Sequence, residues 1–317
     1  MKTITVVTPT FNEEENVLRA YEEIREIFKL HENYTYKHLF IDNNSTDKTQ
    51  TIIKELANKD KNILAIFNRQ NYGQNRSPFY AITQCTSDAV IYIDCDLQDP
   101  PKKIHEFIKS WEQGKKLVIG VKKSSKENKL IYKMREAYYN FLNSISTQKL
   151  QANFCGFGLF DKEVVNFLKT INDPDPYLRG LLIESGFKPA IVYYDQEVRK
   201  KGKTKNNIFS LYDLAMIGIT SYSKVPLRLI IFTGFISGFL SFLIGIIYLI
   251  YKLFYWYSFE AGIAPLIILI SFFFSLLLFF IGILAEYVLA IHQKLYSRQI
   301  VIEKERINFQ DTNKFQS

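Results

Sequence analysis

The 317-residue chain contains few cysteines and lacks the motifs of two large enzyme classes. Its three cysteines, Cys85, Cys95 and Cys155, are an odd number without metal-ligand spacing, which indicates a reducing, cytosolic compartment. The Gly-x-Gly-x-x-Gly fingerprint of dehydrogenases is missing after the first predicted strand, and no phosphate-binding P-loop is present. Because a strand pattern at Ile4 to Val7 follows Met1 so closely, we also expect no secretory signal.

Charged residues are absent from two long runs near the end of the sequence, Leu229 to Tyr251 and Ala261 to Ala285. Each run exceeds the roughly 20 residues that cross the hydrocarbon core of a bilayer. We therefore predict two transmembrane helices within residues 226–291, rather than buried helices of a soluble domain. Lysine and arginine flank the pair on both outer sides, so the positive-inside rule places both ends, including a tail at 292–317, in the cytoplasm. Neither run contains a charged residue, which argues against a transporter.

The first hundred residues alternate strand-like apolar runs with amphipathic segments. The predicted strands are Ile4–Thr8, His38–Asp42, Ile63–Asn68 and Ala89–Asp94, and the predicted helices are Glu13–Leu30, Thr46–Lys59 and Gln74–Thr86. This alternation predicts an α/β domain with a parallel sheet, in which substrates bind outside the carboxyl ends of the strands. Polar residues and glycine gather at the four strand ends, so we expect the loops 9–13, 42–45, 69–73 and 94–98 to converge on one crevice.

The fourth predicted strand delivers two carboxylates, Asp94 and Asp96, and then the amide oxygen of Gln98 into a loop stopped by two prolines. Mg²⁺ and Mn²⁺ take carboxylate and amide oxygens and usually share their remaining coordination with substrate phosphates. A polar turn after a buried strand would give the same short pattern. The residues of the surrounding loops are needed to distinguish a metal site from a polar turn.

Lysine is concentrated in two runs, at residues 122–133 and 200–205, in a chain whose net charge is +8. Such runs suit an anionic membrane surface or nucleic acid. Residues 130–150 and 208–225 have the pattern of helices that lie on a membrane surface, although ordinary core packing would give the same pattern. Because these segments lie near the predicted spans, we expect the lipid bilayer as a partner and no nucleic acid.

The segment Gln299 to Phe309 alternates apolar and charged residues like a short strand. Such a strand could pair with a neighbouring copy, so we expect a homo-oligomer. We also expect residues 1–207 to form the cytoplasmic catalytic domain. The juxtamembrane helix at 208–225, the two spans and the tail at 292–317 follow it.

Four motifs, in order along nearly the whole chain, resemble those of the family 2 glycosyltransferases. They are most similar to the polyprenyl-phosphate glycosyltransferases, the group that includes dolichyl-phosphate mannose synthase and the bactoprenol glucosyltransferases. The motifs are Pro9-Thr10-Phe11-Asn12-Glu13-Glu14, Ile41-Asp42-Asn43-Asn44-Ser45-Thr46-Asp47, Asp94-Cys95-Asp96-Leu97-Gln98 and Arg199-Lys200-Lys201-Gly202-Lys203-Thr204-Lys205. The resemblance implies a GT-A catalytic domain, with a Rossmann-like, parallel-rich sheet, and a nucleotide-sugar donor.

The resemblance also implies roles for residues of the first three motifs. The nucleotide would contact Pro9, Phe11, Glu13, Asp42, Asp94, Cys95 and Asp96. Asp94 and Asp96 would be the catalytic carboxylates, and Asp96 and Gln98 would hold Mg²⁺ or Mn²⁺, whose charge stabilises the departing nucleoside diphosphate. Glu13 and Asp42 also have structural interpretations, as a first-turn helix carboxylate and a strand-end turn former.

The acceptor implied by the resemblance is a polyprenyl phosphate. Because this nucleophile is already ionised near neutral pH, a strong general base is less necessary than positive charge that positions the phosphate. The residues expected to bind the lipid phosphate are Lys122, Arg135, Arg199 and Lys205. Arginine can grip a phosphate in two places, whereas lysine acts as a point charge.

One segment departs from the family pattern. Many relatives carry Gly-Asp-Phe-Arg-Leu, whose Asp has been taken as a base, whereas this chain has Cys155-Gly156-Phe157-Gly158-Leu159. A catalytic carboxylate therefore cannot be carried over to residue 156. We interpret the two glycines as the mark of a different sugar or a more open pocket, because glycine lets a substrate approach the backbone closely.

We therefore expect a multi-pass enzyme of the cell membrane with its catalytic domain in the cytoplasm. It would transfer one sugar, with inversion, from a UDP-hexose or UDP-N-acetylhexosamine to undecaprenyl phosphate or a similar lipid, for cell-surface glycan modification. A processive polysaccharide synthase should carry a Gln-x-x-Arg-Trp motif, which is absent around Trp111 and Trp256. A catalytically silent sugar-nucleotide-binding protein that recruits partners is the other alternative; the intact Asp94 and Asp96 argue against it, and Gly156 keeps it open.

Overall fold

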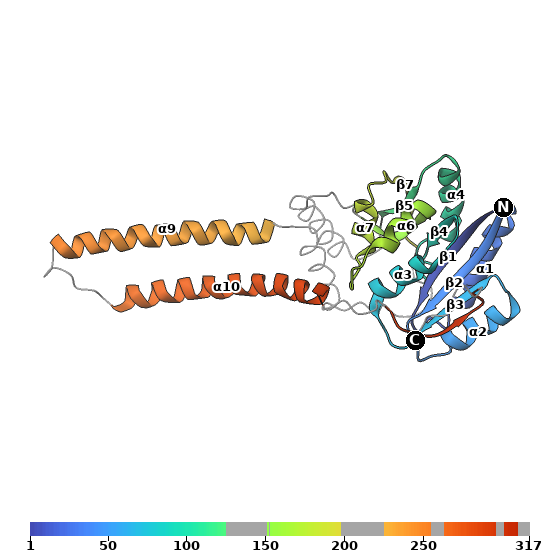
Figure 1. Cartoon of the computed structure of the whole chain (residues 1–317), viewed down its shortest axis with the longest axis horizontal. Helices are drawn as coiled ribbons and strands as arrows, with labels where there is room; N and C mark the ends of the chain where they lie inside the picture. Colours follow the sequence, from blue (N-terminus) through green and yellow to red (C-terminus); the bar gives the residue numbers. More distant parts are fainter. Residues whose placement is uncertain (125–150, 152, 198–224, 255–262, 296–300, 310–317) are drawn as a thin grey trace. The chain divides into compact units, whose positions relative to one another are not determined.

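The computed structural model describes residues 1–124, 151, 153–197, 225–254, 263–295 and 301–309 (Figure 1). The chain divides into two compact units. The first unit contains the N-terminal α/β part together with the last strand. The second unit contains two long helices, α9 (Val225–Phe254) and most of α10 (Ile263–Leu295).

The first unit is built on an eight-stranded sheet of order β7-β5-β6-β4-β1-β2-β3-β8. The strands are β1 (Lys2–Thr10), β2 (Tyr34–Asp42), β3 (Ile63–Asn68), β4 (Ala89–Tyr92), β5 (Leu117–Ser124), β6 (Phe154–Asp161), β7 (Ala190–Asp195) and β8 (Glu303–Ile307). The neighbours β4, β1, β2 and β3 are parallel, which confirms the predicted α/β architecture. Strand β6 runs antiparallel to both β4 and β5, and β8 runs antiparallel to β3.

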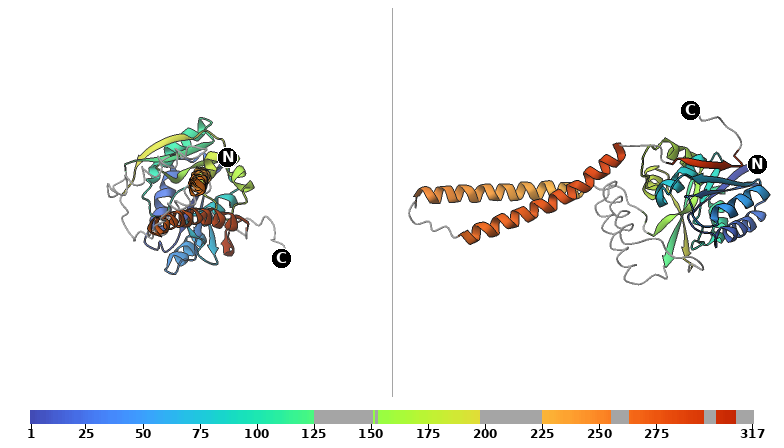
Figure 2. Two further views of the ribbon diagram at one scale, coloured as in Figure 1. Left: turned by 90° about the vertical axis from the view of Figure 1, so that its left-hand side faces the viewer. Right: turned by 90° about the horizontal axis from the view of Figure 1, so that it is seen from below.

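Helices cover both faces of this sheet (Figures 1 and 2). They are α1 (Val17–Lys29), α2 (Thr49–Lys59), α3 (Gly73–Gln84), η1 (Pro101–Lys103), α4 (Ile104–Glu112), α6 (Lys162–Thr170) and α7 (Leu178–Glu184). Successive strand residues point to opposite faces, so Phe40 of β2 joins the core under α1, α2 and α4, whereas Leu39 joins the core under α3, α6 and α7. Because both faces are covered, β4 and residues 63–67 of β3 are continuous apolar runs of buried residues.

The predicted strands are present, and the third has the predicted bounds of β3. The fourth is shorter than predicted and ends at Tyr92, so Asp94 belongs to the loop. The polar loops follow β4, β1, β2 and β3, which are adjacent in the sheet and parallel. From β1 the chain adds β2 and β3 on one side and then β4 on the other, so the strand order reverses between β1 and β4. Open α/β sheets bind ligands at such a switch point. The fold therefore brings the predicted loops to one edge.

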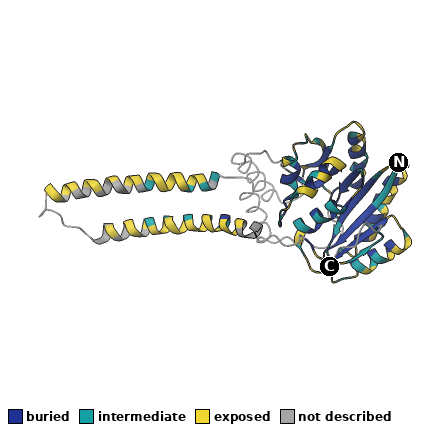
Figure 3. Ribbon diagram, viewed as in Figure 1, coloured by how far each residue is buried: buried dark blue, intermediate teal, exposed yellow. Residues whose placement is uncertain are grey.

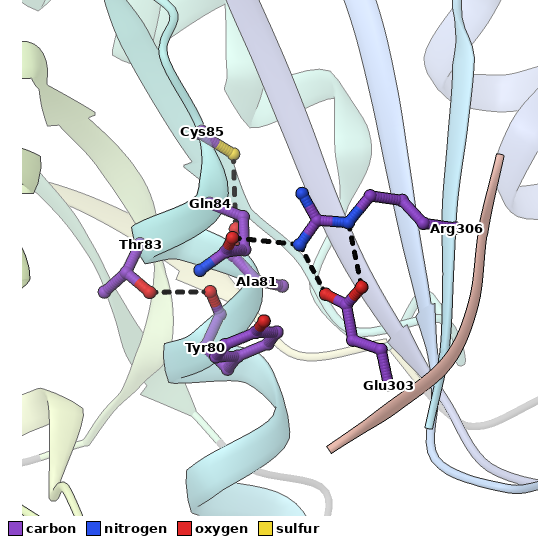
Figure 4. Close-up of polar contacts among 7 residues, drawn as sticks. All are labelled: Tyr80, Ala81, Thr83, Gln84, Cys85, Glu303 and Arg306. Atoms are coloured by element: carbon purple, nitrogen blue, oxygen red, sulfur yellow. Dashed lines mark hydrogen bonds and ion pairs between the residues drawn. The ribbon is translucent and has the colours of Figure 1, made fainter. Parts of the chain in front are cut away.

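The end of the chain completes the sheet of the first unit. A strand, β8, is present within the predicted segment. It pairs with β3 of its own chain, so the prediction that it pairs with a neighbouring copy is wrong. Arg306 of β8 donates hydrogen bonds to Glu303 and, at 3.0 Å, to Oε1 of Gln84 in α3 (Figure 4). The part of the expected cytoplasmic tail that the structure describes thus forms an edge strand, and the oligomeric state stays a prediction.

The second unit consists of apolar helices. Within the described residues, one window, Phe272–Leu289 of α10, is long and apolar enough to cross a membrane, and a shorter apolar stretch, Leu227–Ser237, lies in α9. Exposed side chains predominate along both helices (Figure 3). The predicted interfacial helices at 130–150 and 208–225 lie outside the described residues, apart from Val225, which begins α9.

Candidate active site

The loop after β2 is organised by Asp42. Its fully buried carboxylate accepts hydrogen bonds from Thr10 Oγ1, from Gln50 Nε2, and from the backbone and hydroxyl groups of Ser45, at 2.5 to 3.2 Å. Burial raises the pKa of Asp42, although these donors act in the opposite direction. The contacts support the structural interpretation of Asp42, which fixes the shape of the loop.

The loops after β1 and β2 are joined into one surface. The backbone N–H of Asn12 donates to Ser45 Oγ at 2.8 Å, and Asn12 Oδ1 accepts from the backbone N–H of Thr46 at 2.8 Å. Asn12 has a positive φ of 52°, a conformation that Asn tolerates better than most residues. The half-buried Pro9 and Phe11 flank this junction, so both of these predicted nucleotide contacts lie at the carboxyl edge of the sheet.

Glu13 lies four residues before Val17, the first residue of α1. Its carboxylate accepts a hydrogen bond of 2.6 Å from Asn16 Nδ2, and its backbone carbonyl accepts from the N–H groups of Asn16 and Val17. Asn16 is the N-cap of α1, and the first turn of this helix contains no acidic residue, so the interpretation of Glu13 as a first-turn helix carboxylate is wrong. The contact of Glu13 with a nucleotide stays a prediction.

The loop after β4 alternates buried and half-buried residues. Cys95 and Leu97 are almost fully buried in the core, whereas Asp94, Asp96 and Gln98 are half-buried. Leu97 has a positive φ of 53°, and the backbone N–H of Gln98 donates to Asp96 Oδ1 at 3.2 Å. The tight turn thus keeps Cys95 and Leu97 in the core and leaves the two carboxylates and the amide partly accessible. Because the Cys95 side chain is in the core, a nucleotide could contact only its backbone.

Acidic groups are concentrated in this loop. Burial, followed by the charges of Asp96 and Asp99, raises the pKa of Asp94 to about 7. No cluster of three or more His, Cys, Asp or Glu side chains suited to a metal exists in the described parts of the chain. Asp96 and Gln98 nevertheless fit a hard divalent cation, which accepts amide oxygens and completes its coordination with phosphates and water. They do not form a closed structural metal site.

Lys122 lies beside this loop and is mostly buried. Its ammonium is 3.6 Å from Asp99 Oδ1, which also accepts a hydrogen bond of 2.6 Å from the Tyr194 hydroxyl. Burial lowers the pKa of Lys122, but the neighbouring Cys155 and Asp99 outweigh it and raise the pKa above its ordinary value. Lys122 is therefore a cation at the edge of the acidic loop. The other predicted phosphate-binding residues, Arg135, Arg199 and Lys205, lie outside the described residues.

The end of β7 also contacts the loop. Gln98 Oε1 accepts a hydrogen bond of 3.0 Å from Gln196 Nε2, and the Gln98 carbonyl accepts one of 2.9 Å from the backbone N–H of Glu197. The sequence did not lead us to predict Gln196, Tyr194 or Asp99 as residues of the site. Asp99 could have been suspected from its place directly after the acidic motif, whereas no local signal marks Tyr194 in β7 or Gln196 directly after it.

Gly156 and Gly158, in the segment that departs from the family pattern, are required by close packing. Gly156 has a φ of 111°, and a Cβ there would lie 3.1 Å from the ring of Tyr92. A Cβ on Gly158 would lie 2.4 Å from the carbonyl oxygen of Val118, so no side chain fits without movement of the backbone. The interpretation of a more open pocket is therefore wrong at these positions. The space beside Gly156 holds Tyr92, whose hydroxyl donates to Asp94 Oδ1 at 2.6 Å.

A family model and two curated relatives agree on one family. The family model described as Glycosyl transferase family 2 matches residues 5–168. The bactoprenol glucosyl transferase of Shigella phage SfX is 33% identical over 304 residues, which cover 96% of this chain and 99% of the relative. The bactoprenol glucosyl transferase of Shigella phage SfV is 34% identical over 286 residues, which cover 90% of this chain and 92% of the relative. A solved structure of glucosyl-3-phosphoglycerate synthase from Mycobacterium tuberculosis, with Mn²⁺, UDP and phosphoglyceric acid, is 17% identical, covers 69% of this chain and 76% of its own, and has a TM-score of 0.48.

Proposed function

Because the chain belongs to glycosyl transferase family 2 and is a glycosyltransferase, we propose that it moves a single sugar from a nucleotide-sugar donor to a polyprenyl phosphate. The two phage relatives are bactoprenol glucosyl transferases and match almost the whole chain, which supports the lipid acceptor. The observation that carries the proposal is the position of the partly accessible Asp94, Asp96 and Gln98 in a tight loop at the switch point of the sheet.

The donor binds along the carboxyl ends of β1, β2 and β4. The joined loops around Asn12 and Ser45 offer a preformed surface for the nucleoside, with Pro9 and Phe11 beside it. Asp42 stays in its network of hydrogen bonds and keeps this surface in shape. The proposed donor is a UDP-sugar, either a hexose or an N-acetylhexosamine.

Asp96 and Gln98 hold Mg²⁺ or Mn²⁺, with Asp94 beside them. When bound, such a cation stabilises the negative charge of the departing nucleoside diphosphate. Tyr92 fixes the carboxylate of Asp94 through its hydrogen bond, so the acidic loop needs little rearrangement when the donor arrives.

The acceptor approaches from the side of Lys122. Its phosphate carries the nucleophilic oxygen and is ionised near neutral pH, so direct displacement inverts the sugar carbon without a strong general base. This agrees with the absence of a carboxylate at Gly156. Lys122 contributes positive charge next to the loop, and Arg135, Arg199 and Lys205 are proposed to complete the phosphate site.

The long helices anchor the enzyme in the cell membrane. Only 6% of the window Phe272–Leu289 is buried, unlike a core helix of a soluble domain. The uncharged sequence of α9 from Leu229 to Tyr251 supports a second span. We propose that both spans keep residues 1–207 at the cytoplasmic face, where the donor is found, and that the product serves cell-surface glycan modification.

The test is sugar transfer by membranes that contain the full chain. The membranes are incubated with labelled UDP-sugars and polyprenyl phosphate, with and without EDTA, and the label in the lipid phase is measured. We expect one sugar per lipid in a metal-dependent reaction, and loss of transfer in Asp96→Asn. The matched control is Asp60→Asn, since Asp60 accepts a hydrogen bond from Tyr21 in the turn before β3.

Two outcomes would contradict the proposal. The absence of metal-dependent label with every donor would favour the catalytically silent alternative, and polymer on the lipid would favour a processive synthase. Full activity of Asp96→Asn would remove this residue from the metal site.

A further inference from the structure

Three hydrogen bonds connect the end of β7 to the acidic loop. Gln196 Nε2 donates to Gln98 Oε1 at 3.0 Å, the backbone N–H of Glu197 donates to the Gln98 carbonyl at 2.9 Å, and the Tyr194 hydroxyl donates to Asp99 Oδ1 at 2.6 Å. Strands β5 and β6 lie between β7 and β4 in the sheet, so the loop after β4 reaches across two strand positions to make these contacts. They fix both the backbone and the side chain of Gln98.

A glutamine that binds a metal must present one defined oxygen. Its side chain has three rotatable bonds, and its amide can also turn its NH₂ group toward the cation. An amide oxygen has two lone pairs, so a donor on one side orients it and leaves the other available. Metal ligands are commonly oriented in this way by a hydrogen bond from a neighbouring residue.

We propose that Gln196 is a positioning residue for the metal site. It holds Gln98 Oε1 toward the cation that Asp96 shares, and it acts only through Gln98. This inference rests on the proposed function, in which Asp96 and Gln98 bind the cation. The half-buried Gln196 lies on a different segment from the acidic motif, so the metal site is composite: the loop after β4 supplies the ligands and the end of β7 supplies their orientation.

The test measures binding of Mn²⁺ itself, by electron paramagnetic resonance of the free ion titrated with the purified full chain in detergent. The variants Gln196→Met and Gln196→Leu both remove the donor without adding a charge, and they keep a side chain of similar size. We expect each to weaken Mn²⁺ binding about 10-fold or more, the usual effect of losing such an orienting contact. Gln113→Met, at an exposed position after α4, is the matched control and should bind like the wild type.

A double variant tests whether Gln196 acts through Gln98. Gln98→Met should weaken Mn²⁺ binding by itself, and adding Gln196→Met should then have no further effect, since the two residues share one interaction. A general loss of structure would instead lower the affinity again, and thermal unfolding of each variant would show it. The two Gln196 variants should melt near the wild-type temperature.

The outcomes separate this inference from the proposed function. Wild-type affinity in both Gln196 variants, with binding lost in Asp96→Asn, would overturn the positioning role and leave the metal site intact. Unchanged Mn²⁺ binding in Asp96→Asn would overturn both. An additive loss in the double variant would also overturn the inference, because Gln196 would then act independently of Gln98.

Discussion

The hydroxyl of Tyr92 donates a hydrogen bond of 2.6 Å to the carboxylate of Asp94 two residues later. The ring that carries this hydroxyl is nearly fully buried and lies against the backbone of Gly156. The first carboxylate of the acidic motif is therefore positioned by the last residue of β4 and by the absence of a side chain in β6.

Tyr92→Phe should lower transfer without unfolding the protein. A hydrogen bond to a charged group contributes about 1.5–3 kcal/mol, so kcat/KM should fall roughly 10-fold or more if the bond acts in the transition state. The matched control is Tyr21→Phe, which removes a tyrosine hydrogen bond of 3.1 Å to Asp60. Equal kcat/KM values for the two variants would show that the Tyr92 hydroxyl has no part in positioning Asp94.

Gly156→Asp, which introduces the residue of many relatives, should abolish transfer rather than improve it. The new Cβ would lie 3.1 Å from the Tyr92 ring, and the φ of 111° strains any L side chain, at a cost of about 1–3 kcal/mol. Gly114→Asp is the matched control, because Gly114 has a φ of 87° and open space around the Cβ position. Both variants should lose stability in urea unfolding, and only Gly156→Asp should lose activity. Gain of activity in Gly156→Asp would contradict the packing argument.

Acid should destabilise the first unit through His38. This histidine is fully buried in β2, its ring nitrogens face Thr8 Oγ1 and the Tyr36 hydroxyl at 2.9 Å, and burial lowers its pKa to about 3. Between that value and the unfolded value of about 6.5, the unfolded chain binds one more proton, so stability falls as the pH falls.

The expected slope from His38 is about 1.4 kcal/mol per pH unit, or about 4–5 kcal/mol in total over this window. The measurement is the free energy of unfolding in urea between pH 7 and pH 4. His38→Asn should remove this part of the slope, whatever its effect on stability at neutral pH. Parallel profiles for the wild type and the variant would show that folding does not lower the pKa of His38.

Asn308→Ala should detach the end of β8. The Asn308 amide donates to the carbonyl groups of Ala57 at 2.6 Å and Ile63 at 2.9 Å, and its φ of 61° is disfavoured for alanine. Loss of these contacts should cost about 1–3 kcal/mol of unfolding free energy. Asn308→Gly should recover the part of this loss that comes from the positive φ. Lys304→Ala, at an exposed position of β8, should change the unfolding free energy little. Equal stability of all three variants would mean that β8 contributes nothing to the first unit.

Local patterns were sufficient to predict much of the sheet. The apolar run Ile63–Asn68 is bounded by polar residues on both sides and forms β3 with those limits. The parallel order followed from the alternation of strands and helices, and it correctly placed the loops around Asp42 and Asp94 at one edge. These predictions succeeded because periodicity and chain order are properties of neighbouring residues.

The contacts of β7 and β8 could not be predicted in this way. The pairs Tyr194–Asp99 and Gln196–Gln98 join positions almost a hundred residues apart, and they exist only because β7 lies on the far side of β5 and β6. The alternation at Gln299 to Phe309 correctly indicated a strand, but alternation does not specify which edge the strand joins. Likewise, the missing Cβ of Gly156 was visible in the sequence, whereas the ring that fills the space was not.

The pairing of β8 with β3 affects how the protein is made. The ribosome produces β8 only after α9 and α10, yet β8 belongs to the unit whose other strands were made before them. Until then the nascent first unit has an unpaired edge at β3, and such edges promote aggregation and attract chaperones. Closure of that edge is therefore a late event in biosynthesis. It occurs only in chains whose two apolar helices have already been synthesised.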